Sequence, residues 1–282
     1  MKKFFICLIS VLVLFTSCAS NTKENQTSSS SQTQESKTSS PLPTEPPSAK
    51  AVDSNLSNKR VKWGVGKITD HQQPSEPSSL NEKYKKYNAQ WLLDDKDKIL
   101  LTFDEGYETG STPKILDILK KHNIKAIFFV TYTFAYKNPD LIKSMIDEGH
   151  AVGNHTYSHK TMYEVDIKTA TDEVMLFHNF MKEKYSYTSK YFRFPKGEFS
   201  EKTLNLVNEL GYKTLFWSFA YEDWQSEKNI DRQQVVSKIM TSSHPGEIIL
   251  LHTTNTVTCD ILETVIENTI KQGYSFASPD DI

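Results

Sequence analysis

The sequence predicts an α/β fold, specifically a distorted, incomplete (β/α) barrel with about seven parallel strands. From residue 97 onward, short apolar segments alternate with segments of helical periodicity. Polar residues that are unusual at strand ends follow several of these apolar segments. In a parallel barrel the carboxyl ends of the strands share one rim, so this placement would gather those residues around a single site. The recurrence therefore favours a barrel over a doubly wound sheet.

The candidate strands are short apolar runs, bounded by polar or turn-forming residues. Strands of this kind, separated by helices, are typical of a mostly parallel sheet that is covered on its outer face. The predicted strands span residues 98–103, 125–130, 150–153, 191–194, 212–217, 247–251 and 274–276.

The helices between the strands have recognisable first and last residues. One begins at Thr112, with a proline in its first turn, and a second begins at Asn138 and ends at Gly149. A longer helix is expected over 166–184, where apolar residues recur at helical spacing. Three later helices are expected to begin at Ser200, Asp231 and Asp260.

The amino terminus has the features of an export signal. Two lysines precede an apolar run from Phe4 to Phe15, which is too short to span a bilayer comfortably. Small residues then precede Cys18, in an arrangement that resembles the lipobox of bacterial lipoproteins. We therefore expect residues 1–17 to be a lipoprotein signal peptide and Cys18 to carry the lipid. The alternatives are an ordinary secretory peptide that is cleaved nearby and a retained anchor.

Composition divides the rest of the chain into three parts. Residues 19 to 58 contain sixteen Ser or Thr, four Pro and no aromatic residue, so residues 18–60 are expected to form a disordered tether. Residues 61–96 contain the first aromatic residues after the signal, and we expect them to be an extension that packs on the barrel. Residues 97–282 would form the barrel, in one domain with a single core.

Charge and cysteine content exclude some classes of function. The formal net charge of -2 provides no basic surface for nucleic acid, and we expect a monomer. The three cysteines are Cys7 in the signal, the lipidated Cys18 and Cys259. No intrachain disulfide is then available to the mature chain. Cys259, near an expected helix start, is interpreted as a packing residue.

The first strand ends in two adjacent carboxylates, Asp104 and Glu105. Burying charge at a strand end is costly unless a cation is held against it. A metal ion or an arginine would satisfy this requirement, and the pair of acids alone does not distinguish the two.

Two histidines, His155 and His159, follow the third strand. A spacing of four would place both rings on one face of a helical segment, where they could bind a divalent ion. In isolation such a pair is more often exposed or hydrogen-bonded. Two histidines with one carboxylate, however, leave coordination positions open for water and substrate, as in catalytic rather than structural metal sites.

Three further strand ends carry polar residues that suit the same rim. Arg193 could cover the rim or hold a catalytic carboxylate, and His252, with a reference pKa near 6.5, suits a proton donor. Asp223 could orient a histidine. The aromatic segment 217–224 suits a wall that stacks on sugars, although packing explains either tryptophan equally well. The histidines interpreted as structural are His71, His122, His150, His178 and His244.

Taken together, the motifs resemble those of the NodB-homology polysaccharide deacetylases, carbohydrate esterase family four. The resemblance covers about residues 97 to 280 and rests on five motifs in the family's order. They are Thr102-Phe103-Asp104-Glu105-Gly106, His155-Thr156-Tyr157-Ser158-His159, Arg193-Phe194-Pro195-Lys196-Gly197, Asp223-Trp224 and Leu250-Leu251-His252.

A more specific similarity is to the branch that deacetylates muramic acid on the way to the muramic δ-lactam of spore cortex peptidoglycan. Looser motifs carry it, and the segment from Trp63 to Trp91 also resembles the N-terminal extension of that branch. These motifs are Asp104-Glu105-Gly106-Tyr107-Glu108-Thr109-Gly110, Phe199-Ser200-Glu201, Trp217-Ser218, His244-Pro245-Gly246 and Lys271-Gln272-Gly273-Tyr274.

The family resemblance implies a role for each matched residue. Asp104 would be the general base for the attacking water, held in place by Arg193, and His252 would protonate the departing amine. Asp223 would orient His252. The metal ligands would be His155 and His159, and the backbone N–H of Lys196 would stabilise the oxyanion. The resemblance also implies substrate contacts at Pro195, Trp224 and Leu250.

Three positions depart from the family pattern. Glu105 replaces the usual second Asp; it could ligate the metal, act through water or turn away, and we expect ligation. Lys196 stands where the family commonly has Tyr, a change that leaves the backbone N–H intact. Phe194 stands where the muramic acid branch tends to have Pro, which would alter loop shape rather than chemistry.

The resulting expectation is a hydrolase that removes acetyl groups from muramic acid in peptidoglycan glycan strands. The expected cofactor is a divalent metal, zinc first, with cobalt or manganese as alternatives. The protein would be exported and lipid-anchored to the outer face of the cell membrane through Cys18. One alternative is an N-acetylglucosamine deacetylase acting on peptidoglycan or another glycan. A second is a catalytically weak, glycan-binding lipoprotein.

Overall fold

The computed structural model of the chain describes residues 55–223, 230–254 and 256–282. The predicted signal peptide, Cys18, most of the predicted tether and Trp224 lie outside the described residues. In the part that is described, no helix combines the length and the apolar character needed to cross a membrane.

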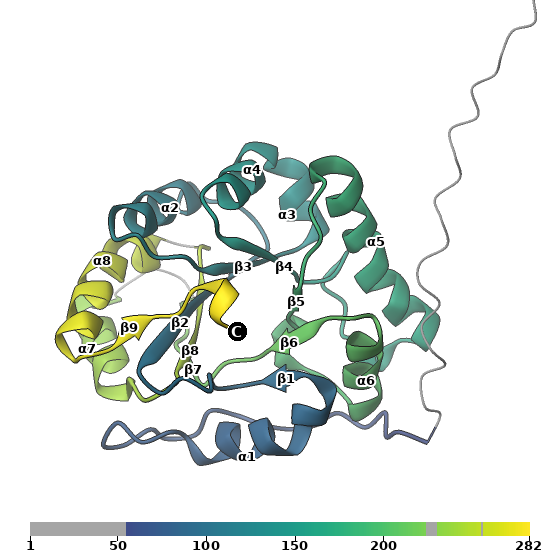
Figure 1. Cartoon of the computed structure of the whole chain (residues 1–282), viewed down its shortest axis with the longest axis horizontal. Helices are drawn as coiled ribbons and strands as arrows, with labels where there is room; N and C mark the ends of the chain where they lie inside the picture. The colour runs from purple at the N-terminus through teal and green to yellow at the C-terminus, as the bar shows by residue number, and fades with distance from the viewer. Residues whose placement is uncertain (1–54, 224–229, 255) are drawn as a thin grey trace, which may run out of the picture. The chain divides into compact units, whose positions relative to one another are not determined.

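Parallel strands form one sheet that curls into an incomplete barrel, which confirms the predicted fold class (Figure 1). Eight strands follow the order β1-β6-β5-β4-β3-β2-β8-β7, and β9 pairs with the start of β2. The strands are β1 Ala89–Gln90, β2 Lys98–Glu105, β3 Ile127–Val130, β4 Ala151–Asn154, β5 Tyr191–Phe192, β6 Lys213–Leu215, β7 Phe219–Ala220, β8 Ile248–His252 and β9 Ser275–Phe276.

Each of the seven predicted segments overlaps a strand, and the two additional strands are β1 and β7. They form the two ends of the hydrogen-bonded order, and each has only two residues. A strand of that length has no alternation for a sequence pattern to reveal, and its pairing depends on the neighbour that tertiary folding supplies.

Helices cover the outside of the curled sheet, and α1 lies across the side where β1 runs (Figure 1). Ser200 and Asp231 cap the helices that follow them, as predicted, whereas α8 begins before Asp260 and neither α1 nor α3 was predicted. The helices are α1 Ser75–Tyr84, α2 Thr112–Lys121, α3 Tyr132–Lys137, α4 Pro139–Asp147, α5 Ile167–Tyr185, α6 Glu201–Glu209, α7 Arg232–Ser242 and α8 Thr256–Lys271.

Strand alternation divides the core into an outer and an inner layer. On β2, Ile99, Leu101 and Phe103 pack in the outer cluster with residues of the surrounding helices. Leu100 instead packs with Ile127, Phe129, Leu215 and other residues of an inner cluster. Because successive side chains point to opposite faces, Asp104 shares the inner face with Leu100, and Glu105 shares the outer face with Phe103.

The two ends of the described chain complete the barrel. Residues before β2 add β1 beside β6, and the fully buried Trp91 stacks on Phe216 with ring centroids 4.1 Å apart. At the other end, the hydroxyl of Tyr191, at the start of β5, donates a hydrogen bond to the carbonyl of Pro279. The carboxyl terminus therefore covers the amino ends of the strands and leaves the carboxyl ends open.

Candidate active site

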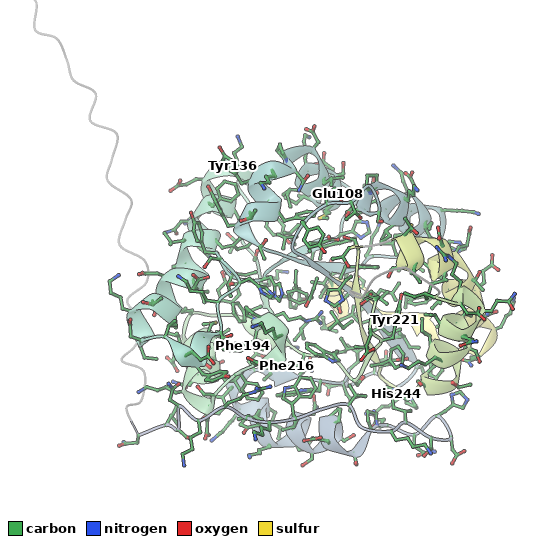
Figure 2. All side chains as sticks on the ribbon, turned by 180° about the vertical axis from the view of Figure 1, so that it is seen from behind. Glu108, Tyr136, Phe194, Phe216, Tyr221 and His244 are labelled. Atoms are coloured by element: carbon green, nitrogen blue, oxygen red, sulfur yellow. The ribbon has the colours of Figure 1, made fainter. Side chains whose placement is uncertain are left out.

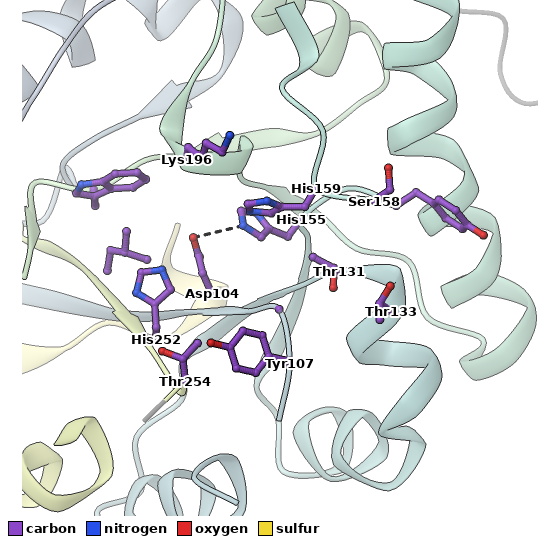
Figure 3. A pocket seen from close by; sticks show the side chains of 14 residues that line it. Asp104, Tyr107, Thr131, Thr133, His155, Ser158, His159, Lys196, His252 and Thr254 are labelled. Carbon is purple, nitrogen blue, oxygen red and sulfur yellow. Dashed lines mark ion pairs between the residues drawn. The ribbon is translucent and has the colours of Figure 1, made fainter. Parts of the chain in front are cut away.

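A cavity of about 760 Å³ opens at the carboxyl ends of the strands (Figure 3). Residues of β2 and β8 line it, together with residues that follow β2, β3, β4, β5, β6 and β8, as expected for a parallel barrel. The lining residues are Asp104, Gly106, Tyr107, Thr131, Thr133, His155, Tyr157, Ser158, His159, Lys196, Trp217, Leu250, His252 and Thr254.

Most of the residues predicted for the site meet here. Asp104, His155, His159, Lys196, Leu250 and His252 line the cavity. Arg193 and Asp223 are fully buried behind this lining, and they contact Asp104 and His252 respectively. Residues separated by about 150 positions thus converge because their strands end at the same rim.

The carboxylate of Asp104 is held in its ionised form. One oxygen accepts a hydrogen bond from Arg193 Nη1 at 2.9 Å, and the other lies 3.6 Å from His155 Nε2. Burial alone would raise the pKa of this carboxyl, but the charge of the Arg193 guanidinium, above all, outweighs burial and lowers the pKa. An ionised carboxylate at the cavity wall can accept a proton from a bound water.

Arg193 is fixed by contacts on every side of its guanidinium. Besides Asp104, it donates to Thr102 Oγ1 at 2.8 Å and to the carbonyls of Leu215 and Phe216 at 2.9 and 3.0 Å. The guanidinium carbon lies 4.2 Å from the ring centroid of Phe129. A buried arginine with this many acceptors is a fixed cation, so it also fixes the carboxylate that it pairs with.

The protonation of His155 can be inferred from its partners. Its Nδ1 lies 2.9 Å from the carbonyl of Arg193, and a carbonyl only accepts, so Nδ1 carries the hydrogen. Burial lowers the pKa of this ring to about 4, which leaves it neutral. The lone pair of Nε2 therefore faces the cavity beside Asp104. A metal-ligating histidine commonly has this arrangement.

The segment from His155 to His159 is a loop and not the helical turn that the spacing suggested. Thr156 and His159 have positive φ values of 71° and 59°, and Glu173 accepts a hydrogen bond from the backbone of Ser158 at 2.7 Å. The loop nevertheless brings the rings of His155 and His159 to a centroid distance of 4.9 Å. The histidine pair forms as predicted, but through a different backbone path.

The donor set fits a divalent metal. Burial lowers the pKa of both histidines, so both are neutral near pH 7, as ligation requires. Neutral imidazoles beside an ionised carboxylate match the ligands that zinc and related ions prefer. Among the described residues, His155 and His159 are therefore the ones that would hold the metal at this cavity.

His252 and Asp223 form an oriented pair. The Nδ1 of His252 lies 2.7 Å from one oxygen of Asp223, and the backbone N–H of His252 donates to the other oxygen at 2.6 Å. Burial by itself favours the neutral ring, but the hydrogen bond and the charge of Asp223 raise the pKa of His252 above its usual value. His252 is thus poised to carry a proton near neutral pH.

Glu105 lies outside the cavity, in contrast to the expectation that it ligates the metal. Its side chain is fully buried on the outer face of β2 and accepts a hydrogen bond from the hydroxyl of Thr253. Burial raises its pKa to about 8. The physical reason is the alternation of the strand, which directs two adjacent side chains to opposite faces. Glu105 therefore connects the ends of β2 and β8.

The turn of residues 195–197 borders the cavity. Lys196 adopts a left-handed backbone with φ of 58° and lines the cavity, whereas Pro195, the first residue of the turn, is buried. A side chain at Gly197 would come within 2.5 Å of Trp217, and the carbonyl of Gly197 accepts a hydrogen bond from Trp63 Nε1 at 2.9 Å. Only glycine fits there, so the turn is packed tightly against the N-terminal extension.

Several residues of the cavity were not predicted as site residues. Tyr107, which is 61% exposed, stands at the mouth, and the phenol oxygen points inward in Figure 3. Thr131 and Thr133 contribute from the segment after β3. These residue types have no chemistry that distinguishes them from ordinary loop residues. Like Asp104, they lie at or just after the carboxyl end of a strand, and this position is the sequence signal that could have identified them as cavity residues.

The histidines interpreted as structural are hydrogen-bonded elsewhere in the fold. His71 contacts the carbonyl of Ser243 at 2.7 Å, and His244 contacts Ser218 Oγ at 2.9 Å. His150 accepts from the backbone N–H of Ala126 at 3.1 Å. His178 contacts Tyr212 and His122 contacts Glu263, both at 2.9 Å. None of the five lines the cavity.

The arrangement supplies the parts that amide hydrolysis requires. Asp104 can accept a proton and His252 can donate one, and the two residues lie at paired positions on the neighbouring strands β2 and β8 (Figure 3). Two neutral histidines can hold an electrophilic cation beside them. A site with a separate base and acid suits an amide, because the departing nitrogen must be protonated before it leaves.

Comparison with known protein families gives a match to the polysaccharide deacetylase model over residues 93–215. The matched region runs from the segment before β2 to β6 and includes Asp104, the histidine pair and Arg193. Asp223 and His252 follow it along the chain.

Known proteins resemble the chain over most of its length. Peptidoglycan-N-acetylmuramic acid deacetylase PdaA of Bacillus subtilis is 40% identical over 232 residues, which cover 80% of this chain and 87% of PdaA. The solved structure of PdaA, described as a family 4 carbohydrate esterase, aligns with a TM-score of 0.76 at 38% identity, covering 80% of this chain and 97% of that one.

Two further proteins show the range of the likeness. A family 4 carbohydrate esterase from Bacillus anthracis aligns with a TM-score of 0.66 at 34% identity, over 80% of this chain and 97% of that one. A peptidoglycan-N-acetylglucosamine deacetylase of Bacillus cereus is 35% identical over 159 residues, which cover 56% of this chain and 57% of that protein. The similarity to PdaA thus covers more of this chain than the similarity to the Bacillus cereus protein does.

Proposed function

Because this chain belongs to the polysaccharide deacetylase family, whose members are hydrolases of amide bonds, we propose that it removes the acetyl group from N-acetylmuramic acid in peptidoglycan. The observation that carries the proposal is the separate base and acid at one cavity, Asp104 paired with Arg193 and His252 paired with Asp223. The similarity to PdaA over 80% of the chain supports muramic acid as the sugar.

In the proposed reaction, Asp104 accepts the proton of the attacking water, and Arg193 keeps the carboxylate ionised and oriented. The carbonyl oxygen of the acetyl group becomes negatively charged and is stabilised by the backbone N–H of Lys196. His252 then donates its proton to the nitrogen, and the C–N bond breaks to release acetate and the free amine. Asp223 holds His252 in the orientation for this transfer.

Family members generally depend on a divalent metal, and here His155 and His159 would hold it. When bound, the ion supplies Lewis-acid polarisation of the acetyl carbonyl and activation of water. We propose zinc, with cobalt or manganese able to substitute, because two imidazole ligands suit these ions.

The proposal is tested by acetate release from purified peptidoglycan. Residues 55–282 are incubated with the polymer, with and without prior removal of the peptide stems by an amidase, in the presence of Zn, Co or Mn. We expect acetate release and a preference for the stripped polymer, whose free muramic acid can then close to the δ-lactam of spore cortex. No release from either polymer with any of the three metals would overturn the enzymatic proposal.

The nearest alternative is deacetylation of N-acetylglucosamine. The similarity to the peptidoglycan-N-acetylglucosamine deacetylase of Bacillus cereus supports this alternative. Mass spectrometry of the digested product distinguishes the two, because only one of the two sugars loses its acetyl group. A catalytically weak, glycan-binding lipoprotein would instead show glycan binding by calorimetry without turnover or bound metal.

We also propose that the protein is exported and anchored to the outer face of the membrane by a lipid on Cys18, and that it acts there as a monomer. The basic and apolar segment before Cys18 supports this proposal. Fractionation of cells that express the wild-type chain or Cys18→Ser tests the anchor. Release of the variant, but not of the wild type, from the membrane is the expected result.

A further inference from the structure

The two sugars of peptidoglycan differ in one substituent. Muramic acid carries a lactyl ether on the ring carbon next to the one that bears the acetamido group, whereas glucosamine carries a hydroxyl there. The lactyl group ends in a carboxylate when no peptide is attached and in a neutral amide when the stem is present. A site that acts on muramic acid can therefore select its substrate by binding the negatively charged carboxylate beside the amide that is cleaved.

One cation borders the cavity at a suitable place. Among the described residues that line the cavity, Lys196 is the one lysine or arginine. It lies on the 195–197 turn, next to the backbone N–H assigned to the oxyanion, and Figure 3 shows it at the edge of the cavity above His155 and His159. A substituent adjacent to the acetamido group would lie within the range of its flexible side chain.

A second, smaller hollow of about 80 Å³ lies next to this edge. Lys196 and Trp217 line both cavities, and the other residues of the smaller one include Arg60, Trp63 and Glu198. The lactyl group, which projects away from the sugar ring, needs space of this kind next to the main cavity. Trp63 belongs to the N-terminal extension, so the extension forms part of the wall.

The neighbouring charges leave Lys196 available to an anion. Arg60 and Glu198 form an ion pair at 2.9 Å, so their charges offset one another. The carboxylate of Asp104 is paired with Arg193, and Glu105 faces the outer layer of the barrel. Among the described residues that line the two cavities, Lys196 is therefore the cation for which no acid lies at ion-pair distance.

Building on the proposed function, we propose that Lys196 binds the lactyl carboxylate of peptide-free muramic acid and so determines which sugar is deacetylated. The hollow lined by Trp63 and Trp217 receives the lactyl group, and the ammonium group pairs with the carboxylate. Attachment of the peptide stem converts the carboxylate to an amide and removes the negative charge that Lys196 binds. Glucosamine lacks the group altogether.

The test compares two forms of one substrate. Peptide-free glycan strands are prepared with the lactyl carboxylate free or converted to its methyl ester, and kcat/KM for acetate release is measured for both with the purified protein. The methyl ester removes the negative charge, and a hydrogen bond between charged groups is stronger than one between neutral groups. We therefore expect the wild type to prefer the free acid by roughly ten-fold or more.

Substitutions at Lys196 show whether that preference depends on its charge. In Lys196→Met the chain length and the backbone N–H are kept, and the ratio of the two kcat/KM values should fall toward one. Lys196→Arg should keep most of the preference. The matched control is Lys62→Met, which removes an exposed lysine of the N-terminal extension that lines neither cavity. Its ratio should equal that of the wild type.

A binding measurement gives a readout independent of turnover. Calorimetry on the metal-free protein with N-acetylmuramic acid and its methyl ester should show weaker binding of the ester to the wild type, and equal binding of the two to Lys196→Met. Three results would overturn the inference. The wild type could show equal kcat/KM values for the free acid and the ester, or Lys196→Met could keep the wild-type preference for the free acid. Lys62→Met could also lose that preference to the same extent as Lys196→Met. Failure of the wild type to release acetate from any strand would instead overturn the proposed function.

Discussion

Asp104 and Glu105 are neighbours in the chain with opposite environments. Asp104 faces the cavity and pairs with a fixed arginine, which lowers its pKa, whereas Glu105 is buried on the other face, which raises its pKa to about 8. One carboxyl is therefore ionised near neutral pH, and the other is protonated. The difference arises from the side of the strand each occupies and not from the residue type.

Asp104→Asn tests the assignment of the general base. The amide cannot accept the proton of the attacking water, so we expect kcat/KM to fall by roughly 10²–10⁴-fold. The histidine pair is unaffected, and metal analysis should give the content of the wild type. If metal and activity were lost together, Asp104 would be a ligand and not only a base.

Glu105→Gln is the matched substitution at the adjacent position. Because the side chain lies outside the cavity, we expect metal content and acetate release to remain close to those of the wild type. The amide oxygen can still accept the hydrogen bond of Thr253. Loss of metal in this variant would mean that Glu105 reaches the site in a way that the structure does not show.

The raised pKa of Glu105 also predicts a pH dependence of stability. Unfolded Glu105 ionises near 4.5 and folded Glu105 near 8, so between these values the folded state binds one more proton. The free energy of unfolding of the wild type should therefore decrease as pH rises through that window. Glu105→Gln removes this contribution, so denaturation at pH 5 and pH 8 should show the variant gaining stability relative to the wild type at the higher pH.

At the scale of secondary-structure elements, the pairing of β7 with β8 orients His252, the proposed proton donor. Phe219 and Ala220 of β7 pair with Ile249 and Leu250 of β8, so the residues that follow β7 lie beside His252. Asp223 then contacts both the ring and the backbone of His252. A strand of two residues thus determines the orientation of the proton donor.

The pH profile of the reaction should reflect this pair. Activity requires ionised Asp104 and neutral ligand histidines, so kcat/KM should rise with pH on the acid side, where the pKa of His155 is about 4. It should fall again as His252 loses its proton, at a pH above 6.5. In Asp223→Asn the pKa of His252 falls, and the alkaline limb should move to lower pH by on the order of one unit.

The control for this profile is Asp231→Asn, which changes an aspartate that caps α7. Its pH limbs should coincide with those of the wild type. An unchanged alkaline limb in Asp223→Asn would show that His252 does not titrate as the proton donor.

The packing of β3 against β4 requires glycine at residue 153. A Cβ there would lie 2.4 Å from the ring of Phe129, its partner in the strand register, and Phe129 in turn supports the guanidinium of Arg193. We expect Gly153→Ala to lower the free energy of unfolding by about 1–3 kcal/mol. Gly64→Ala, where no atom lies within 4 Å, should change it by less than about 0.5 kcal/mol. Urea denaturation measures both.

At the scale of the whole molecule, the segment before β2 is part of the fold. It supplies β1 at one end of the sheet and Tyr84, Tyr87 and Trp91 to a buried aromatic cluster. Removing a single buried Phe or Trp side chain costs about 3–5 kcal/mol, and a whole domain is stable by only about 5–15 kcal/mol. The stabilising free energy lost with the whole segment would therefore exceed the free energy of unfolding of the domain.

A chain that begins at residue 97 should therefore fail to fold cooperatively, although it contains all the predicted catalytic residues. Residues 55–282 should give a single cooperative unfolding transition by circular dichroism. A stable, active fragment 97–282 would show that the extension is an accessory and that the barrel is complete without it.

The polar strand ends and the order of the five motifs predicted both the fold class and the residues that meet at the cavity. This succeeded for Asp104, His155, Arg193 and His252 because side chains that face inward at the carboxyl ends of the barrel strands all lie at one rim. Helix starts at Ser200 and Asp231 were predictable for a similar reason, since capping is a local interaction.

Tertiary structure alone decided the rest. Glu105 was expected at the metal, but which face of β2 it occupies depends on how the strand is rotated against its neighbours. The strands β1 and β7 exist only because longer strands offer them hydrogen-bonding partners. The hollow beside Lys196 forms where the N-terminal extension meets the 195–197 turn, more than 130 residues away. Such contacts between distant segments leave no local pattern, because their free energy appears only when both segments are in place.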